Sequence, residues 1–192
     1  MKRLLITGFD SFGENTVNPS WEAVKQLPEI CSGYMLCKLE IPTIFGIAAQ
    51  TVLAKGEEFH PDVILCVGLA AGRDAVTPER IAVNIRDARI PDNAGYHAAG
   101  EPVTPEGPAA IFSTVPVKEM AAAIRAAGIP GAVSNTAGTY VCNDTLYTLL
   151  HRCEAGGIRV GFIHVPALPS PGKPGLPLED TVRALEAAIS AL

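Results

Sequence analysis

The stretch DVILCV at residues 62–67 is a continuous apolar run that starts directly after Asp62 and ends before Gly68. Such a run is typical of a β-strand that is covered on both faces, as strands are in a parallel sheet between helices. Residues 158–165 repeat this pattern, and residues 3–7 carry a shorter version of it. The three runs predict buried strands of one sheet.

Helical patterns alternate with these strands. Asn18 followed by Pro19 is the usual start of a helix, which we expect to reach about residue 26. Thr43 predicts the cap of a second helix that ends at Gly56. Further helices are predicted over 116–127, over 143–155 and from Glu179 onward, short strands over 38–41, 80–85 and 132–133, and loops over 8–18, 90–108 and 166–177. Alternating strands and helices predict an α/β fold with a mostly parallel sheet.

Length and composition narrow the class of protein. A chain of 192 residues is expected to form one domain, spanning 1–192. Hydrophobic residues make up 48% of it and charged residues 18%, which excludes an intrinsically disordered protein and favours an oligomer that buries part of the surface. The net charge of −5 and the absence of a basic block argue against a nucleic-acid partner.

The N-terminus and the cysteines indicate a cytoplasmic protein without a membrane segment. Only a run of three apolar residues, 4–6, directly precedes Thr7, too short for a signal peptide, and the longest apolar stretch, 63–72, is about half of a membrane span. The five cysteines form no CxxC pair, so we expect neither a disulfide framework nor a zinc site.

Three residues that could carry chemistry follow buried strands. Glu79, Cys142 and His164 lie just past, or at the end of, predicted strands, and the carboxyl ends of parallel strands meet at one edge of a sheet. A thiol, an imidazole and a carboxylate at one edge suggest nucleophilic catalysis. Cys142 also opens a predicted helix, whose N-terminus is expected to lower the thiol pKa.

Each of these residues has a plainer interpretation. Cys142 is about equally well read as a small buried hydrophobe, and His164 as a core histidine bonded to a carbonyl. By pattern alone, Glu79 is better read as a surface ion pair with Arg73 or Arg80. A low-pKa Cys142 would also suit a redox sensor, although no resolving cysteine is nearby. The glycine-rich segments GFDSFG and GLAAGR match no nucleotide-binding motif.

Five segments contain most of these residues: TGFDSFGENTVNPS (7–20), GLAAGRDAVTPERIAVN (68–84), DARIPDNAGY (87–96), SNTAGTYVCN (134–143) and GFIHVPALP (161–169). In this order they closely resemble motifs of the type I pyroglutamyl peptidases, also called pyrrolidone carboxyl peptidases. The resemblance implies a cysteine exopeptidase that removes N-terminal pyroglutamate from peptides. It further implies a three-layer α/β/α sandwich, a homotetramer, and no metal or cofactor.

The resemblance also implies roles for individual residues. Cys142 would be the nucleophile, His164 the base and Glu79 the residue that orients the histidine, with Arg89 supporting the oxyanion. The implied substrate-binding residues are Phe9, Phe12, Asn18, Leu69, Ile90, Tyr140 and Val141. Pyroglutamate is a neutral lactam, so we expect a dry pocket without a carboxylate, which would reject a charged amino terminus.

Two alternatives remain beside the peptidase. Many members of the family have Gln where this chain has Leu69, and Gly where it has Ala71. A cysteine amidase with a retuned pocket on the same scaffold is therefore one alternative. The other is a non-catalytic protein that binds a small molecule, which the set of Cys142, His164 and Glu79 argues against.

Overall fold

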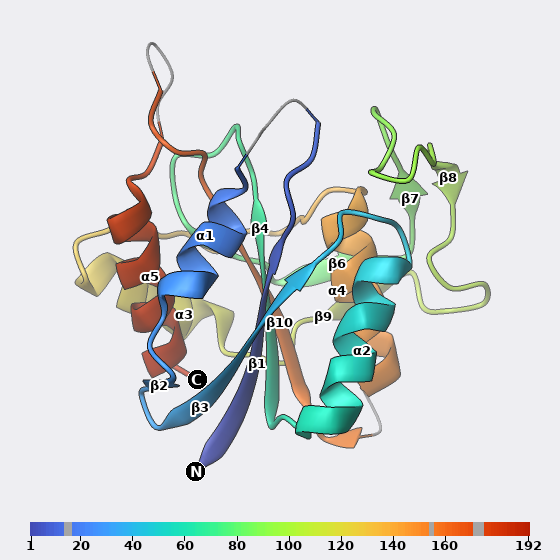
Figure 1. Ribbon diagram of the computed structural model, residues 1–192. Coiled ribbons are helices and arrows are strands. Elements are labelled where there is room, and N and C mark those ends of the chain that lie inside the picture. Colours follow the sequence, from blue (N-terminus) through green and yellow to red (C-terminus); the bar gives the residue numbers. More distant parts are fainter. Residues whose placement is uncertain (14–16, 154–155, 171–174) are drawn as a thin grey trace.

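A six-stranded sheet forms the centre of the molecule (Figure 1). The computed structural model describes residues 1–13, 17–153, 156–170 and 175–192. The strand order is β2-β3-β1-β4-β10-β5, in which β3, β1, β4 and β10 run parallel and the edge strands β2 and β5 run antiparallel to their neighbours. The strands are β1 (Lys2–Phe9), β2 (Ile30–Cys31), β3 (Tyr34–Ile41), β4 (Val63–Leu69), β5 (Thr77–Pro78) and β10 (Arg159–Val165).

Helices cover both faces of this sheet. Figure 1 shows α1 (Pro19–Gln26), α3 (Val117–Ala126) and α5 (Leu178–Ser190) on one side, and α2 (Ile47–Phe59) and α4 (Val141–Cys153) on the other. Two small antiparallel pairs lie outside the main sheet: β6 (Ile81–Val83) with β9 (Ala110–Phe112), and β7 (Arg86–Asp87) with β8 (Ala99–Glu101). The predicted three-layer α/β/α sandwich with a mostly parallel, mixed sheet is confirmed.

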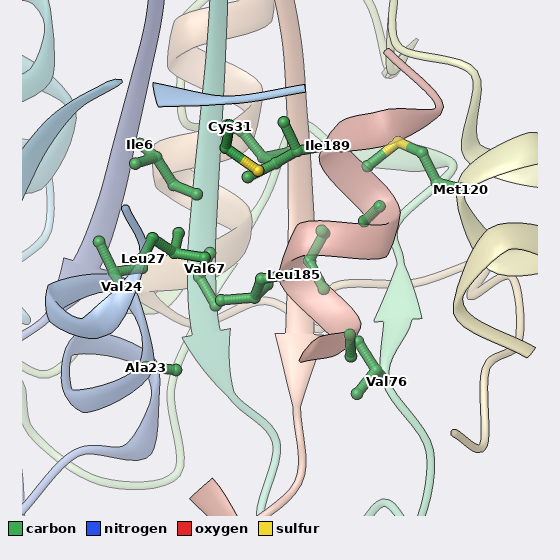
Figure 2. Close-up of a cluster of buried hydrophobic side chains, with 14 of the residues drawn as sticks. Ile6, Ala23, Val24, Leu27, Cys31, Val67, Val76, Met120, Leu185 and Ile189 are labelled. Atoms are coloured by element: carbon green, nitrogen blue, oxygen red, sulfur yellow. The ribbon is translucent and has the colours of Figure 1, made fainter. Parts of the chain in front are cut away.

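The apolar run of β4 is explained by two separate cores. Val63, Leu65 and Val67 pack with α1, α3 and α5, whereas Ile64 and Cys66 pack with α2 and α4. Figure 2 shows the first of these cores, where side chains of α1 and α5 approach Val67. Successive side chains of a strand point to opposite faces, so a strand between two helical layers is apolar at every position.

The start of α1 follows the prediction. The Asn18 side-chain oxygen accepts the backbone N–H of Ser20 at 3.1 Å, and Pro19 occupies the first helical position. The helix then lies very close to β1. An added Cβ at Gly8 would lie 2.5 Å from the backbone Cα of Trp21, so only glycine fits there.

The predicted bounds of α2 are wrong at both ends. The Thr43 hydroxyl and backbone N–H both donate to Asp10 Oδ1 at 2.8 Å, so Thr43 holds a loop and Gly46 precedes the helix. Gly56 lies inside the helix, which ends at His60 in the left-handed conformation with φ 50°. Glycine can adopt helical backbone angles, so the helix continues through Gly56. It ends only where His60 adopts the left-handed conformation.

The predicted strand at 132–133 is also wrong. Ala132 is exposed, and the segment contributes only isolated bridges, from Gly131 to Val76 and from Ser134 to Glu79. The predicted strand at 80–85 shortens to β6, and the predicted loop at 90–108 contains β8. Parts of three other predictions, at residues 14–16, 154–155 and 171–174, lie outside the described residues.

Among the residues that the structure describes, no helix is long and apolar enough to cross a membrane.

The contact between Gly8 and α1 predicts opposite effects for two glycine substitutions. Gly8→Ala forces backbone atoms of Ser20 and Trp21 to move and is expected to lower the free energy of unfolding by about 1–3 kcal/mol. Gly56→Ala has open space around it inside the last turn of α2 and is expected to raise the free energy of unfolding by about 0.5–1 kcal/mol. Urea unfolding of both variants measures the difference, and equal effects would contradict the close approach.

Candidate active site

A cavity of about 290 Å³ lies at the carboxyl ends of the parallel strands. Its walls come from the ends of β1, β4 and β10, the start of α4 and the loops between them. These strand ends and loops gather at the top of the view in Figure 1. The lining residues are Phe9, Phe12, Asn18, Thr43, Leu69, Ala70, Arg73, Thr136, Ala137, Gly138, Tyr140, Cys142 and His164.

Cys142 faces the cavity from the first turn of α4. It is the second residue of that helix, and its side chain is half-buried. The sulfur of Cys142 lies close to the backbone of β4. A Cβ added at Gly68 would be only 3.0 Å from Sγ. Gly68 is paired with His164 in the register of β4 and β10, so the strand pairing brings the thiol and the imidazole to one place.

Glu79 lies behind the histidine. Its Oε1 is 2.8 Å from Nδ1 of His164, and its side chain is completely buried. Its backbone is held by β10, since the Glu79 N–H donates to the carbonyl of Phe162 at 2.8 Å. The interpretation of Glu79 as part of a surface ion pair is therefore wrong, because its carboxylate is buried. The expected partner Arg73 does contact it.

Arg73 is a residue whose position sequence reasoning missed. It lines the cavity, and its Nη1 lies 2.5 Å from Oε1 of Glu79. Its Nη2 donates to the carbonyl of Thr136 at 2.8 Å. The sequence pattern indicated Arg73 only as a possible surface partner of Glu79. Its position in GLAAGR, directly after the buried strand β4, was the signal that could have placed it at the site.

Burial dominates the protonation of the thiol and the imidazole. Burial raises the pKa of Cys142 to about 12, with a further contribution from the charge of Glu79. Burial also lowers the pKa of His164, against the opposing effect of Glu79. The predicted lowering of the Cys142 pKa is therefore wrong, because loss of water outweighs the helix N-terminus. Both shifts favour a neutral thiol and a neutral imidazole, whereas a redox sensor needs a thiol of low pKa.

Five of the predicted substrate-binding residues line the cavity: Phe9, Phe12, Asn18, Leu69 and Tyr140. The rings of Phe12 and Tyr140 lie 6.3 Å apart, and the Tyr140 hydroxyl donates to the carbonyl of Pro91. Asn18 serves the structure as well. Its side-chain oxygen caps α1, and its Nδ2 donates to the carbonyl of Asp10 at 2.8 Å.

Besides Glu79, which lies behind His164, three predicted site residues do not line this cavity. Arg89 and Ile90 are exposed, and Val141 is fully buried in the core between α4 and the sheet. The cation that the structure brings to the cavity is Arg73 rather than Arg89. Further lining residues that sequence reasoning missed are Thr43, Ala70, Thr136, Ala137 and Gly138.

The remaining His, Cys, Asp and Glu side chains bear on metal binding and on further thiol chemistry. Within the described part of the chain, no group of three or more His, Cys, Asp or Glu side chains is arranged to hold a metal ion. Cys66 and Cys153 are buried among apolar side chains of the core, as predicted.

Comparisons with known proteins agree with this geometry. Residues 2–192 match the family described as pyroglutamyl peptidase. The pyrrolidone-carboxylate peptidase of Levilactobacillus brevis is 52% identical, over 99% of this chain and 97% of its own length. The crystal structure of pyroglutamyl peptidase I from Bacillus amyloliquefaciens is 41% identical and superposes with a TM-score of 0.95, covering 100% of this chain and 96% of that one.

A more distant structure shares the fold over a similar length. The pyrrolidone carboxyl peptidase of Thermococcus litoralis is 35% identical with a TM-score of 0.94, and the match covers 100% of this chain and 93% of that chain. Whole-length matches in both sequence and structure establish the relationship. The chain belongs to the pyroglutamyl peptidase family.

Proposed function

We propose that this protein is a cysteine exopeptidase that removes N-terminal pyroglutamate from peptides. The observation that carries the proposal is a buried Glu79–His164 pair next to Cys142 in a largely apolar cavity. The names of its relatives, pyrrolidone-carboxylate peptidases with about half of their residues identical to this chain, support the same activity.

His164 acts as the base in the proposed reaction. Its Nδ1 faces the Glu79 carboxylate and therefore carries the proton, which leaves the lone pair on Nε2 for the thiol of Cys142. The thiol proton moves to Nε2 as the sulfur attacks the carbonyl that joins pyroglutamate to the next residue. Because both groups are neutral at rest, proton transfer accompanies attack.

The remaining steps use the same groups. The first backbone N–H groups of a helix have no partner within it, and the N–H of Cys142 is available there to stabilise the oxyanion. The imidazolium of His164 then returns its proton to the leaving amine, and a thioester remains on Cys142. Water, deprotonated by His164, attacks the thioester and releases pyroglutamate together with the free thiol.

The walls of the cavity suit a neutral ring. The aromatic rings of Phe9, Phe12 and Tyr140 contribute apolar surface, and no carboxylate is among the lining residues. A free amino terminus entering this cavity would lose its hydration without gaining a counter-charge, which is costly. Arg73 on the cavity wall adds repulsion against such a cation. The cavity therefore favours a cyclised, uncharged N-terminus.

We further infer a cytoplasmic homotetramer. All five cysteines are free thiols, which suits a reducing compartment. Exposed apolar side chains at Met1, Ile30 and Met35 lie next to one another at the edge formed by β2 and β3, and the low charge content is consistent with burial of such surface between copies. Light scattering of the purified protein tests the number of subunits.

Replacement of the thiol is expected to abolish peptidase activity. The wild-type protein should release a fluorescent amine from its pyroglutamyl amide but not from the prolyl or glutamyl amides. Cys142→Ala should reduce kcat/KM by at least about a thousandfold, because no other group forms the thioester. Cys37→Ala removes a half-buried thiol on β3, outside the cavity, and should retain full activity.

Each outcome of this assay separates the alternatives. Activity that survives Cys142→Ala would contradict the cysteine mechanism. Turnover of amides without the lactam ring would indicate an amidase with a retuned pocket, for which Leu69 on the cavity wall is the candidate cause. Inactivity of the wild type on all three amides would favour a binding protein.

The pH profile should have widely separated limbs. The acid limb of kcat/KM reports protonation of His164 in the free enzyme, and it should fall below the ordinary histidine pKa of 6.5 because burial lowers that pKa. The alkaline limb reports loss of the Cys142 proton and should lie above the ordinary thiol value of 9.0. Steady-state kinetics across pH measures both limbs.

Removal of the Glu79 charge should move both limbs of this profile to lower pH, because Glu79 raises the pKa of His164 and also that of Cys142. Glu79 raises the pKa of His164, so Glu79→Gln should lower kcat/KM and move the acid limb to still lower pH. Glu22→Gln, at the surface of α1, is the matched control and should leave the profile unchanged. An acid limb that stays in place in Glu79→Gln would show that the carboxylate does not act on the imidazole.

A further inference from the structure

Arg73 joins three segments that surround the reaction centre. It lies in the turn after β4, where its backbone N–H donates to the carbonyl of Ala70 at 3.0 Å. One end of its guanidinium, Nη1, contacts both Glu79 Oε1 and Thr77 Oγ1, and the other end, Nη2, donates to the carbonyl of Thr136. Thr77 is paired with His164 in the register of β5 and β10, and Thr136 lies on the cavity wall.

The guanidinium and the imidazole share one carboxylate oxygen. Arg73 Nη1 and His164 Nδ1 both contact Oε1 of Glu79, at 2.5 and 2.8 Å. The other oxygen, Oε2, is buried and has no hydrogen-bond partner among the described residues. A buried carboxylate is expensive unless a cation is paired with it, so Arg73 is what keeps a charged Glu79 in this place.

We propose that Arg73 is a positioning residue of the peptidase reaction, which holds the ionised Glu79 against His164 and ties the loop before Cys142 to the same carboxylate. This inference rests on the proposed function. It assigns to Arg73 a role in both the chemistry and the shape of the cavity, since residues 136–138 form part of the wall.

Arg73 also acts on the charges of the site. The groups that bear on His164 are Glu79 and Arg73, and those that bear on Cys142 are Glu79, Cys66 and Arg73. The cation of Arg73 lowers the pKa of His164 and the pKa of Cys142. Its removal should therefore move both limbs of the pH profile to higher pH, in the direction opposite to the acid-limb shift of Glu79→Gln.

Lysine would replace the charge of Arg73 but not its geometry. Glu79 and Thr136 are bound by different nitrogens of the planar guanidinium, whereas an ammonium group is a single nitrogen. Arg73→Lys should keep the limbs of the profile near their wild-type positions and lose the bond to Thr136. Arg73→Ala should lose both the charge that sets the limbs and the bond to Thr136.

The experiment compares kcat, KM and pH profiles of wild type, Arg73→Ala and Arg73→Lys on the pyroglutamyl amide. Arg73→Ala is expected to lower kcat/KM by about 10- to 100-fold, the usual effect of losing a hydrogen bond to a charged group. Guanidinium chloride at non-denaturing concentration should restore part of the activity, and urea at the same concentration should not. Arg73→Lys is expected to raise KM more than it lowers kcat.

The matched control is Arg125→Ala. Arg125 likewise donates to a loop carbonyl, that of Gly131 at 2.9 Å, but it is exposed on α3 and does not line the cavity. Arg125→Ala should leave kcat, KM and both limbs of the pH profile unchanged. Unmoved limbs in Arg73→Ala, or the absence of rescue by guanidinium in a folded variant, would overturn the proposal.

Alkylation of Cys142 by iodoacetamide keeps this test separate from the proposed function. Its rate follows the thiolate fraction and needs no substrate, so a rise of the Cys142 pKa in Arg73→Ala slows alkylation at a given pH. If the wild type fails to cleave the pyroglutamyl amide, the proposed function fails while the alkylation shift still measures the effect of Arg73. If Arg73→Ala does not fold, the unchanged limbs and raised KM expected of Arg73→Lys carry the test.

Discussion

The buried carboxylate of Glu79 is the constraint around which the site is built. A charge without access to water needs partners in fixed positions, and Glu79 has them in Arg73 and His164. Its backbone is bound to β10 on one side and bridged to Ser134 on the other. The turn after β4, the strand β10 and the loop before α4 are thus held together by Glu79 and its neighbours.

The sheet explains why residues far apart in sequence meet at this carboxylate. Parallel strands end at the same edge, so β1, β4 and β10 deliver Phe9, Leu69 and His164 to one cavity. Gly68 then allows the sulfur of Cys142 to approach β4, where a larger residue would occupy the space. The sheet, packed between two cores, therefore sets the positions of these residues, and the loops after its strands complete the cavity.

Much of this arrangement was predictable from the sequence, and the exceptions share a physical cause. Long apolar runs and the Asn18–Pro19 cap indicated the central strands and α1, because their signals are local. The two-residue strands β2 and β5 are too short for a periodic pattern, and the strand expected at 132–133 is exposed. The burial of Glu79, the pKa of Cys142 and the approach of Arg73 rather than Arg89 all depend on contacts across the fold, which local sequence does not contain.

The order of strands has a consequence for synthesis on the ribosome. β10 is the last strand among the described residues, yet it lies inside the sheet, between β4 and β5. Until it emerges, β4 presents an unpaired and highly apolar edge, the kind of surface that templates aggregation. His164 arrives on this same strand, so the nascent chain acquires its imidazole only when that edge is closed. Closure of the sheet and delivery of His164 to the cavity are thereby reached in a single late step.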